Sequence, residues 1–137
     1  AVETMNWYSE EIFYLVGALR DGSVYRYEKT RNYYVIWYSS NKAFLEKVIC
    51  SKLRKLGYTK CKPYVYKQNH YRVRICSKKL YDIMVNVFEH PVNNHGRKSP
   101  WPTPKVVKEA PLRYQLEYIK GFVDAEGNII RSKKVCK

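Results

Sequence analysis

Two segments of the chain each end a run of apolar residues with an acid and a glycine. The first runs from Ile12 to Gly22 and closes on Asp21, and the second runs from Leu116 to Gly127 and closes on Glu126. Each run predicts a helix, and a glycine directly after it suits a left-handed C-cap. The negative end of the helix dipole would add to the charge of Glu126, so we expect this position to attract a hard divalent cation.

Small residues on the same segments predict how two such helices meet. Gly121 and Ala125 stand one helical turn apart, on one face of the second helix, where a second helix could approach closely. Gly17 is the corresponding small residue of the first helix, although three residues separate it from Asp21 whereas four separate Gly121 from Glu126. Aligned on the acids, Val16 and Arg20 would take the small-residue positions. We expect an interface built on Gly17, Gly121 and Ala125.

This pattern resembles the signature of the LAGLIDADG homing endonucleases, and the separation of its two copies is similar to that in the single-chain members. The resemblance implies that Asp21 and Glu126 are the catalytic residues and bind Mg²⁺ or Mn²⁺, with Gly22 and Ala125 as further residues of the metal site. It implies Mg-dependent, site-specific hydrolysis of double-stranded DNA, by an enzyme of the kind encoded within introns or inteins. We expect Asp124 to lie at the helix end or in solvent, away from the metal.

The composition favours a polyanionic partner. The chain has 137 residues, a formal net charge of +14 and a pI of about 9.7. Residues 47–81 contain eleven Lys and Arg and no acid, and the chain interleaves its basic residues with fourteen tyrosines and three tryptophans. Flat aromatic groups beside positive charges are typical of nucleic-acid surfaces, although a solvated basic face is the plainer explanation.

The hydrophobic periodicity predicts an α+β fold. Helices are expected over residues 9–20, 41–56 and 78–88, and they alternate with two hairpins, 23–29 with 33–38 and 62–67 with 71–76. This order gives the LAGLIDADG-type αββαββα unit, with a four-stranded antiparallel sheet covered by helices on one face. The helix near residue 116 would then be the first helix of a second unit.

The resemblance implies that the uncovered face of the sheet forms a saddle on the DNA major groove. Alternation along the strands divides each strand between this face and the core, with Arg26 and Glu28 falling on the core side. A bulge, an edge location or the opposite register would each account for those two. Ser39 or Ser40 is the weak candidate for positioning water. The expected DNA-binding residues are Tyr25, Tyr27, Lys29, Lys62, Tyr64, Tyr66, Gln68, His70, Arg72 and Arg74.

The domain organisation predicted from these elements has three parts. Residues 1–90 form the first domain, residues 91–111 a proline-rich linker, and residues 112–137 the start of a second domain, with its motif helix and at most one strand. Double-stranded DNA is the expected partner, together with a second polypeptide or second copy that completes the second domain. An RNA maturase that assists intron splicing and a non-catalytic DNA-binding half remain as alternative functions.

The remaining residues carry weaker signals. The four cysteines have no metal-ligand spacing, and we expect reduced thiols that are mostly buried. His90 and His95 have no companion ligands at fitting spacing, and Trp101 is expected to pack in the protein. The sequence contains no secretory signal or long apolar run. These features predict an intracellular protein, cytoplasmic or organellar, with no membrane partner.

Overall fold

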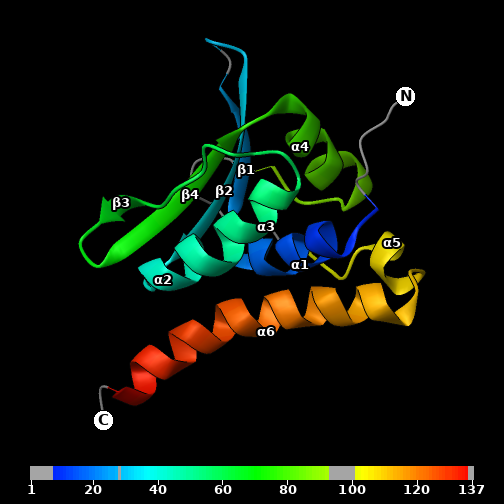
Figure 1. Cartoon of the computed structure of the whole chain (residues 1–137). Helices are drawn as coiled ribbons and strands as arrows, with labels where there is room; N and C mark the ends of the chain where they lie inside the picture. The colour runs from blue at the N-terminus through cyan, green and yellow to red at the C-terminus, as the bar shows by residue number, and fades with distance from the viewer. Residues whose placement is uncertain (1–7, 28, 93–100, 136–137) are drawn as a thin grey trace.

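The computed structural model describes residues 8–27, 29–92 and 101–135, and the side chains of these residues apart from Asp21 and residues 127–135. Helices α1, α3 and α4 and the sheet lie on one side of the long helix α6 (Figure 1). Short 3₁₀ or π turns extend several of the helices. In chain order the elements are α1 (Glu10–Ala18) with a 3₁₀ turn (Leu19–Asp21), β1 (Ser23–Tyr27), β2 (Asn32–Ser39), α2 (Lys42–Phe44), a π turn (Leu45–Ile49), α3 (Cys50–Lys55), β3 (Tyr64–Lys67), β4 (His70–Cys76), α4 (Lys78–Asp82) with a π turn (Ile83–Val87), α5 (Lys105–Lys108) and α6 (Leu112–Val135).

Side-chain caps begin the three helices of the first unit. Ser9 Oγ accepts from the amide of Ile12 at 3.3 Å, and Asn41 Oδ1 accepts from that of Phe44 at 3.1 Å. Ser77 Oγ accepts from the amide of Leu80 at 3.1 Å and begins α4. Each cap satisfies a backbone donor that a helix leaves free at its first turn. The helix starts predicted from these residues are confirmed.

The four strands form one antiparallel sheet in the order β1-β2-β4-β3. Each hairpin turns through a residue with positive φ, Arg31 at 59° and Asn69 at 61°. In this order β2 and β4 are the inner strands, which pair with each other, and β1 and β3 are the edge strands. The predicted α+β fold with a four-stranded antiparallel sheet is confirmed.

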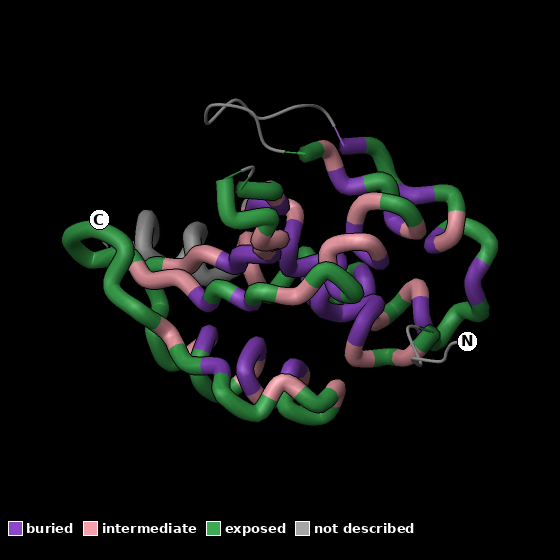
Figure 2. The backbone as a smooth tube through the Cα atoms, turned by 90° about the horizontal axis from the view of Figure 1, so that it is seen from above, coloured by how far each residue is buried: buried purple, intermediate pink, exposed green. Residues whose placement is uncertain are grey.

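The core lies between the helix-covered face of the sheet and α1. Val35, Trp37 and Val73 point to this side and are at most 1% exposed. Trp37 Nε1 donates to the carbonyl oxygen of Leu15 at 3.0 Å, which fixes α1 against β2. Figure 2 shows that the buried stretches gather in the middle of the molecule and that the hairpin tips are exposed. The sheet thus holds α1 in one orientation.

Helix α6 is longer than the sequence predicts. We expected the helix to end at Gly127 and at most one strand to follow, but α6 runs as one helix from Leu112 to Val135. A strand needs a partner strand for its backbone groups, whereas a helix satisfies them internally. The predicted C-cap at Gly127 is therefore wrong, while the described residues up to Val135 contain no strand after the motif helix, which the prediction of at most one strand allows. No helix in the described ranges is both long enough and apolar enough to cross a membrane.

Candidate active site and nucleic-acid face

The site begins with the contact between α1 and α6, which lie side by side and run in the same direction (Figure 1). A Cβ on Gly17 would fall on the carbonyl oxygen of Tyr118 and 2.9 Å from the amide nitrogen of Phe122. A Cβ on Gly121 would fall on the carbonyl oxygen of Tyr14 and 3.1 Å from the amide nitrogen of Ala18. Backbone meets backbone at both glycines, so any larger residue would separate the helices.

The contact is reciprocal, because each glycine packs against the backbone of the other helix. One offset in the sequence relates Tyr14 to Tyr118, Gly17 to Gly121, and Ala18 to Phe122. The two helices therefore meet as equivalent elements about a local two-fold relation. Ala125, the other small residue predicted for this interface, is half-buried and packs against the core. The structure thus places Gly17, Gly121 and Ala125 at or beside the helix contact.

The two motifs end in different backbone conformations. The difference compensates for the spacing between glycine and acid, which is one residue shorter in the first motif than in the second. After Ala18 the chain tightens into a 3₁₀ turn over Leu19–Asp21. A 3₁₀ residue advances by about 2.0 Å against about 1.5 Å in an α-helix, so the four steps from Gly17 to Asp21 advance roughly 7 Å. The five α-helical steps from Gly121 to Glu126 advance roughly 7.5 Å. The turn brings the backbone of Asp21 nearly level with that of Glu126, and it contacts α6.

Glu126 does not sit at a helix end. Because α6 continues to Val135, its carboxylate lies along a helix, and the predicted contribution of the helix dipole to its charge is wrong. Its side chain is half-buried. Because the helix continues on both sides of Glu126, its backbone position is fixed without a capping glycine.

Asp124 has a structural partner. The hydroxyl of Tyr14 donates to Asp124 Oδ2 at 2.6 Å, which joins α1 to α6 on the N-terminal side of the acids. Burial first, and then the hydrogen bond and charge of Asp124, raise the pKa of Tyr14 far above its ordinary value of 10.0. Asp124 is exposed, as expected, but it does not lie at a helix end, and its carboxylate is also a partner in the helix interface.

Arg20 connects the 3₁₀ turn that carries Asp21 to α6. Its Nη1 donates to the hydroxyl of Tyr118 at 3.0 Å. The guanidinium carbon lies 4.9 Å from the ring centre of Trp101 and 5.6 Å from that of Phe122. In the aligned motifs this position corresponds to a small residue, but here the long side chain of Arg20 lies beside the helix contact. Arg20 therefore links the residue before Asp21 to α6 and to the segment that enters α5.

His90 and Trp101 also contact the 3₁₀ turn that carries Asp21. His90 Nε2 lies 3.2 Å from the carbonyl oxygen of Leu19, its ring centre lies 4.3 Å from that of Trp101, and burial lowers its pKa. Trp101 Nε1 donates to the carbonyl oxygen of Phe88 at 3.0 Å. The prediction that Trp101 packs in the protein is confirmed. His95 lies outside the described residues.

The sheet face turned away from the helices carries the predicted aromatic and basic residues. The register places Tyr25, Tyr64, Arg72 and Arg74 on this face, and the 5.0 Å distance between the rings of Tyr38 and Tyr66 adds Tyr66 to it. Tyr27 and His70 follow the same alternation at the strand ends. Lys29 and Gln68 lie in the hairpin turns, and Lys62 precedes β3.

Two tyrosines on this face were not among the predicted residues. Tyr34 and Tyr38 of β2 pair across the sheet with Cys76 and Arg72, respectively. They alternate with Val35 and Trp37, so the same period-two pattern that predicts the core side of β2 identifies them. The polar face therefore includes residues of all four strands, with the buried Ile36 between Tyr34 and Tyr38.

Arg26 and Ser39 lie on the helix-covered face. Arg26 is opposite Tyr33 on the edge strand β1, is exposed, and has its guanidinium carbon 5.5 Å from the centre of the Tyr33 ring. Of the three explanations left open, the edge location holds for Arg26, while Glu28 lies outside the described residues. Ser39 Oγ accepts from the amide of Asn41 at 2.9 Å. Strand alternation points Ser39 away from the polar face, so the structure does not support a water-positioning role.

The donor set at the two acids suits a hard cation. Carboxylate and carbonyl oxygens are the ligands that Mg²⁺ prefers, and Mg²⁺ commonly uses one or two carboxylates and keeps several waters. Within the described side chains there is no group of three or more His, Cys, Asp and Glu residues that could hold a metal. Cys50 and Cys61 are buried free thiols, Cys76 is an exposed one, and burial raises the pKa of Cys50 to about 12. The candidate site remains the one that the two motifs indicate, at Asp21 and Glu126.

Comparisons with known proteins agree with this arrangement, although no family model matches the chain. The fold matches the LAGLIDADG fold of I-DmoI. A structure of I-DmoI in complex with DNA and Mn has a TM-score of 0.60 and 22% sequence identity, covering 85% of this chain and 61% of that one. A structure with DNA and Ca has a TM-score of 0.61 and 22% identity, covering 85% of this chain and 57% of that one.

In sequence, the chain is 65% identical over 123 residues to homing endonuclease I-ApeI of Aeropyrum pernix. The match covers 90% of this chain and 54% of the relative, so the chain spans about half the length of that protein. The resemblance to the LAGLIDADG homing endonucleases is confirmed by this relative and by the fold.

The glycine contact predicts a large loss of stability when either glycine gains a side chain. Gly17→Ala and Gly121→Ala should each lower the free energy of unfolding by about 3 kcal/mol or more, because the added carbon meets backbone that cannot move aside. Denaturant unfolding measures this. Gly57→Ala is the control: its φ is +103°, but an added Cβ meets nothing within 4 Å. A cost at Gly17 and Gly121 no larger than at Gly57 would contradict the close contact.

The pair formed by Tyr14 and Asp124 predicts a pH dependence. The folded protein keeps Tyr14 protonated, whereas the unfolded chain ionises it near pH 10.0. Its contribution to stability is therefore complete below that pH and is lost as the pH rises above it. Tyr14→Phe should cost about 1 to 2 kcal/mol at neutral pH and should reduce the fall in stability at alkaline pH. Tyr64→Phe, at an exposed tyrosine, should leave that fall unchanged. An equal alkaline fall in Tyr14→Phe and the unmodified protein would contradict the assignment.

Proposed function

We propose that the chain provides one DNA-binding unit and both motif helices of a site-specific endonuclease that hydrolyses double-stranded DNA with a divalent metal. The observation that carries the proposal is the reciprocal glycine contact, which sets two acid-bearing segments side by side at the start of a basic, aromatic sheet face. The sequence similarity to a homing endonuclease supports the same reaction. Because the match covers 54% of that relative, full activity is proposed to need the remainder of a second unit or a partner.

Asp21 and Glu126 are the proposed metal-binding and catalytic residues, with Gly22 and Ala125 beside them. Mg²⁺ or Mn²⁺ bound there would polarise the scissile phosphate, lower the pKa of the attacking water and stabilise the leaving oxygen. The two carboxylates need not carry protons, so their task is to keep fixed positions. The Tyr14 to Asp124 hydrogen bond and the contacts of Arg20 hold the backbone that leads to each of them.

The polar face of the sheet is the proposed DNA surface. Phosphate contacts from lysines and arginines supply affinity, and base contacts from the sheet supply selectivity. The net charge of +14 supports a partner with many phosphates. We therefore propose that this face binds one half of a DNA site through the major groove, with an affinity that falls steeply as salt increases.

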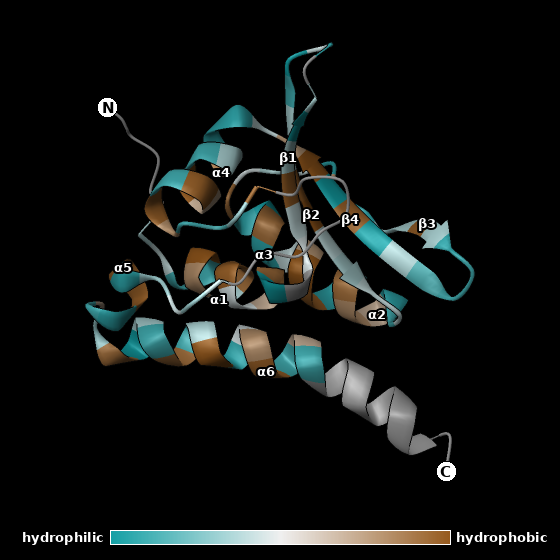
Figure 3. Ribbon diagram, turned by 180° about the vertical axis from the view of Figure 1, so that it is seen from behind, coloured by the Kyte–Doolittle hydropathy of each residue, from teal (hydrophilic) through white to brown (hydrophobic). Residues whose placement is uncertain are grey.

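Helix α6 supports the proposal that a second unit begins near residue 112. The offset that relates the two glycines also relates Ile12, Leu15 and Leu19, each 0% exposed, to Leu116, Ile119 and Val123, which are 53%, 51% and 53% exposed. Figure 3 shows hydrophobic positions recurring along the described part of α6. The sheet and α3 cover this face on α1. We propose that a second unit of the same kind covers it on α6, from the same polypeptide or from a partner.

Substitution of either acid tests the reaction. Asp21→Asn and Glu126→Gln should each reduce cleavage of a randomised plasmid library in Mg²⁺ by at least about a hundredfold, as expected when a group that stabilises the transition state is lost. Binding of duplex DNA should persist. Asp82→Asn is the control, because its carboxylate pairs with Lys78 on α4. The solution mass of each protein is recorded in the same buffer, so that assembly is known.

Three outcomes would overturn parts of the proposal. Cleavage that survives in both acid variants would exclude the two carboxylates. Loss of binding together with cleavage would show that the acids support the fold or the DNA contact. A folded chain that binds structured intron RNA in preference to duplex DNA at matched salt would favour the maturase alternative.

A further inference from the structure

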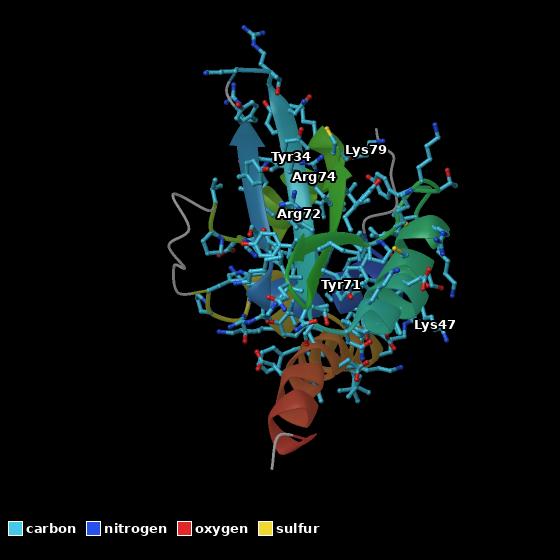
Figure 4. All side chains as sticks on the ribbon, turned by 90° about the vertical axis from the view of Figure 1, so that its left-hand side faces the viewer. Tyr34, Lys47, Tyr71, Arg72, Arg74 and Lys79 are labelled. Carbon is cyan, nitrogen blue, oxygen red and sulfur yellow. The ribbon has the colours of Figure 1, made fainter. Side chains whose placement is uncertain are left out.

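Two arginines of β4 are held against tyrosine rings on the polar face. The guanidinium carbon of Arg74 lies 4.8 Å from the centre of the Tyr34 ring, and that of Arg72 lies 5.5 Å from the centre of the Tyr66 ring. Tyr34 and Tyr66 are themselves braced, by Tyr25 at 5.2 Å and Tyr38 at 5.0 Å between ring centres. Tyr34, Arg74 and Arg72 follow one another along the sheet (Figure 4). Stacking on a ring restricts where a long side chain can point.

These two arginines differ from others whose guanidinium groups are occupied. Arg20 donates to Tyr118, Arg54 to the carbonyl oxygen of Cys61 and Arg113 to Tyr114. Among the described residues, no hydrogen bond or ion pair involves the guanidinium of Arg72 or Arg74. Ring stacking uses the flat face of the group and leaves its N–H edge available. A planar, oriented edge with several donors is suited to a planar partner with two acceptors.

The place of β4 in the sheet favours base edges over phosphates. It is an inner strand, between β2 and β3. When a sheet lies in a groove, its middle faces the bases and its rims face the two phosphate backbones. The edge strand β3 and the segment before it instead carry lysines. Lys62 Nζ lies 5.5 Å from the ring centre of Tyr64, and Lys67 Nζ lies 5.8 Å from that of Tyr66. Lysine is a flexible point charge that suits phosphate contact.

We propose that Arg72 and Arg74 each read one guanine of the target, through the O6 and N7 acceptors of its major-groove edge, with the two guanines about two base pairs apart. Guanine is the base whose paired acceptors match an arginine edge. Two residues along a strand span about 6.8 Å, which matches two base-pair steps of about 3.4 Å. This assignment rests on the proposed duplex-DNA function and adds the base that each arginine selects. Tyr34 and Tyr66 are positioning residues for this readout, because their rings orient the two arginines.

The test is selection of bound sequences from a randomised double-stranded DNA library without divalent metal, so that cleavage plays no part. The unmodified chain should enrich sites with two guanines in this spacing. Arg72→Lys and Arg74→Lys should each reduce the preference for guanine by about tenfold, at one position each and not at the other. Tyr34→Leu should weaken the preference only at the position read by Arg74, whereas Tyr34→Phe, which keeps the ring, should preserve it.

Arg26→Lys is the matched control, because Arg26 lies on the opposite face of the same sheet, and thermal unfolding of each variant shows whether it is folded. Weaker binding to all sequences with unchanged base preference would assign both arginines to phosphates and overturn the proposal. Enriched sites that lack the two guanines, or no enrichment, would overturn it as well. A chain that selects the guanines, but whose cleavage survives in both Asp21→Asn and Glu126→Gln, would support this readout and contradict the proposed catalytic acids alone.

Discussion

The close contact of α1 and α6 at Gly17 and Gly121 is the constraint on which the rest of the site depends. Two helices usually pack 8–10 Å apart because side chains separate them. Here each glycine lies on the backbone of the other helix, and a single methyl group at either position would overlap a carbonyl oxygen. The contact therefore fixes both the separation and the register of the helices. This contact therefore determines how the backbones of Asp21 and Glu126 lie relative to each other.

Every other feature near the acids reinforces this contact. Tyr14 donates to Asp124 and Arg20 donates to Tyr118, so two long side chains from the α1 segment join it to α6 at two points. On the sheet side, Trp37 ties α1 to β2 through Leu15. The sheet face and the helix contact are thus parts of one rigid arrangement. An enzyme that must cut at a fixed distance from the bases it reads needs such a coupling between site and surface.

Local signals in the sequence predicted most of the fold, and the failures have a common cause. Ser9, Asn41 and Ser77 act within one helical turn, so the helix starts could be predicted from them. The alternation in β4 likewise predicted which face Arg72 and Arg74 share. In contrast, the partners of Asp124 and Arg20 come from segments far away in the sequence. No local pattern encodes a hydrogen bond between residues 14 and 124. Ser39 ends β2, and whether the last residue of a strand faces the core or the polar side depends on a register that local sequence does not fix.

The unequal ends of the two motifs show how far local sequence decides a helix end. Asp21–Gly22 and Glu126–Gly127 are the same kind of signal, yet the first ends a helix and the second does not. Gly22 leads directly into β1, and a Cβ there would lie 2.6 Å from Leu19 Cδ1 and on the carbonyl oxygen of Ile36 in β2. The chain must leave α1 at this point because β2 offers backbone partners to the next residues. Gly127 costs about 1 kcal/mol relative to alanine inside a helix, which is less than the cost of leaving an extended strand unpaired. A glycine thus permits a helix to end. Whether the helix does end there depends on whether the following residues can pair with a neighbouring strand.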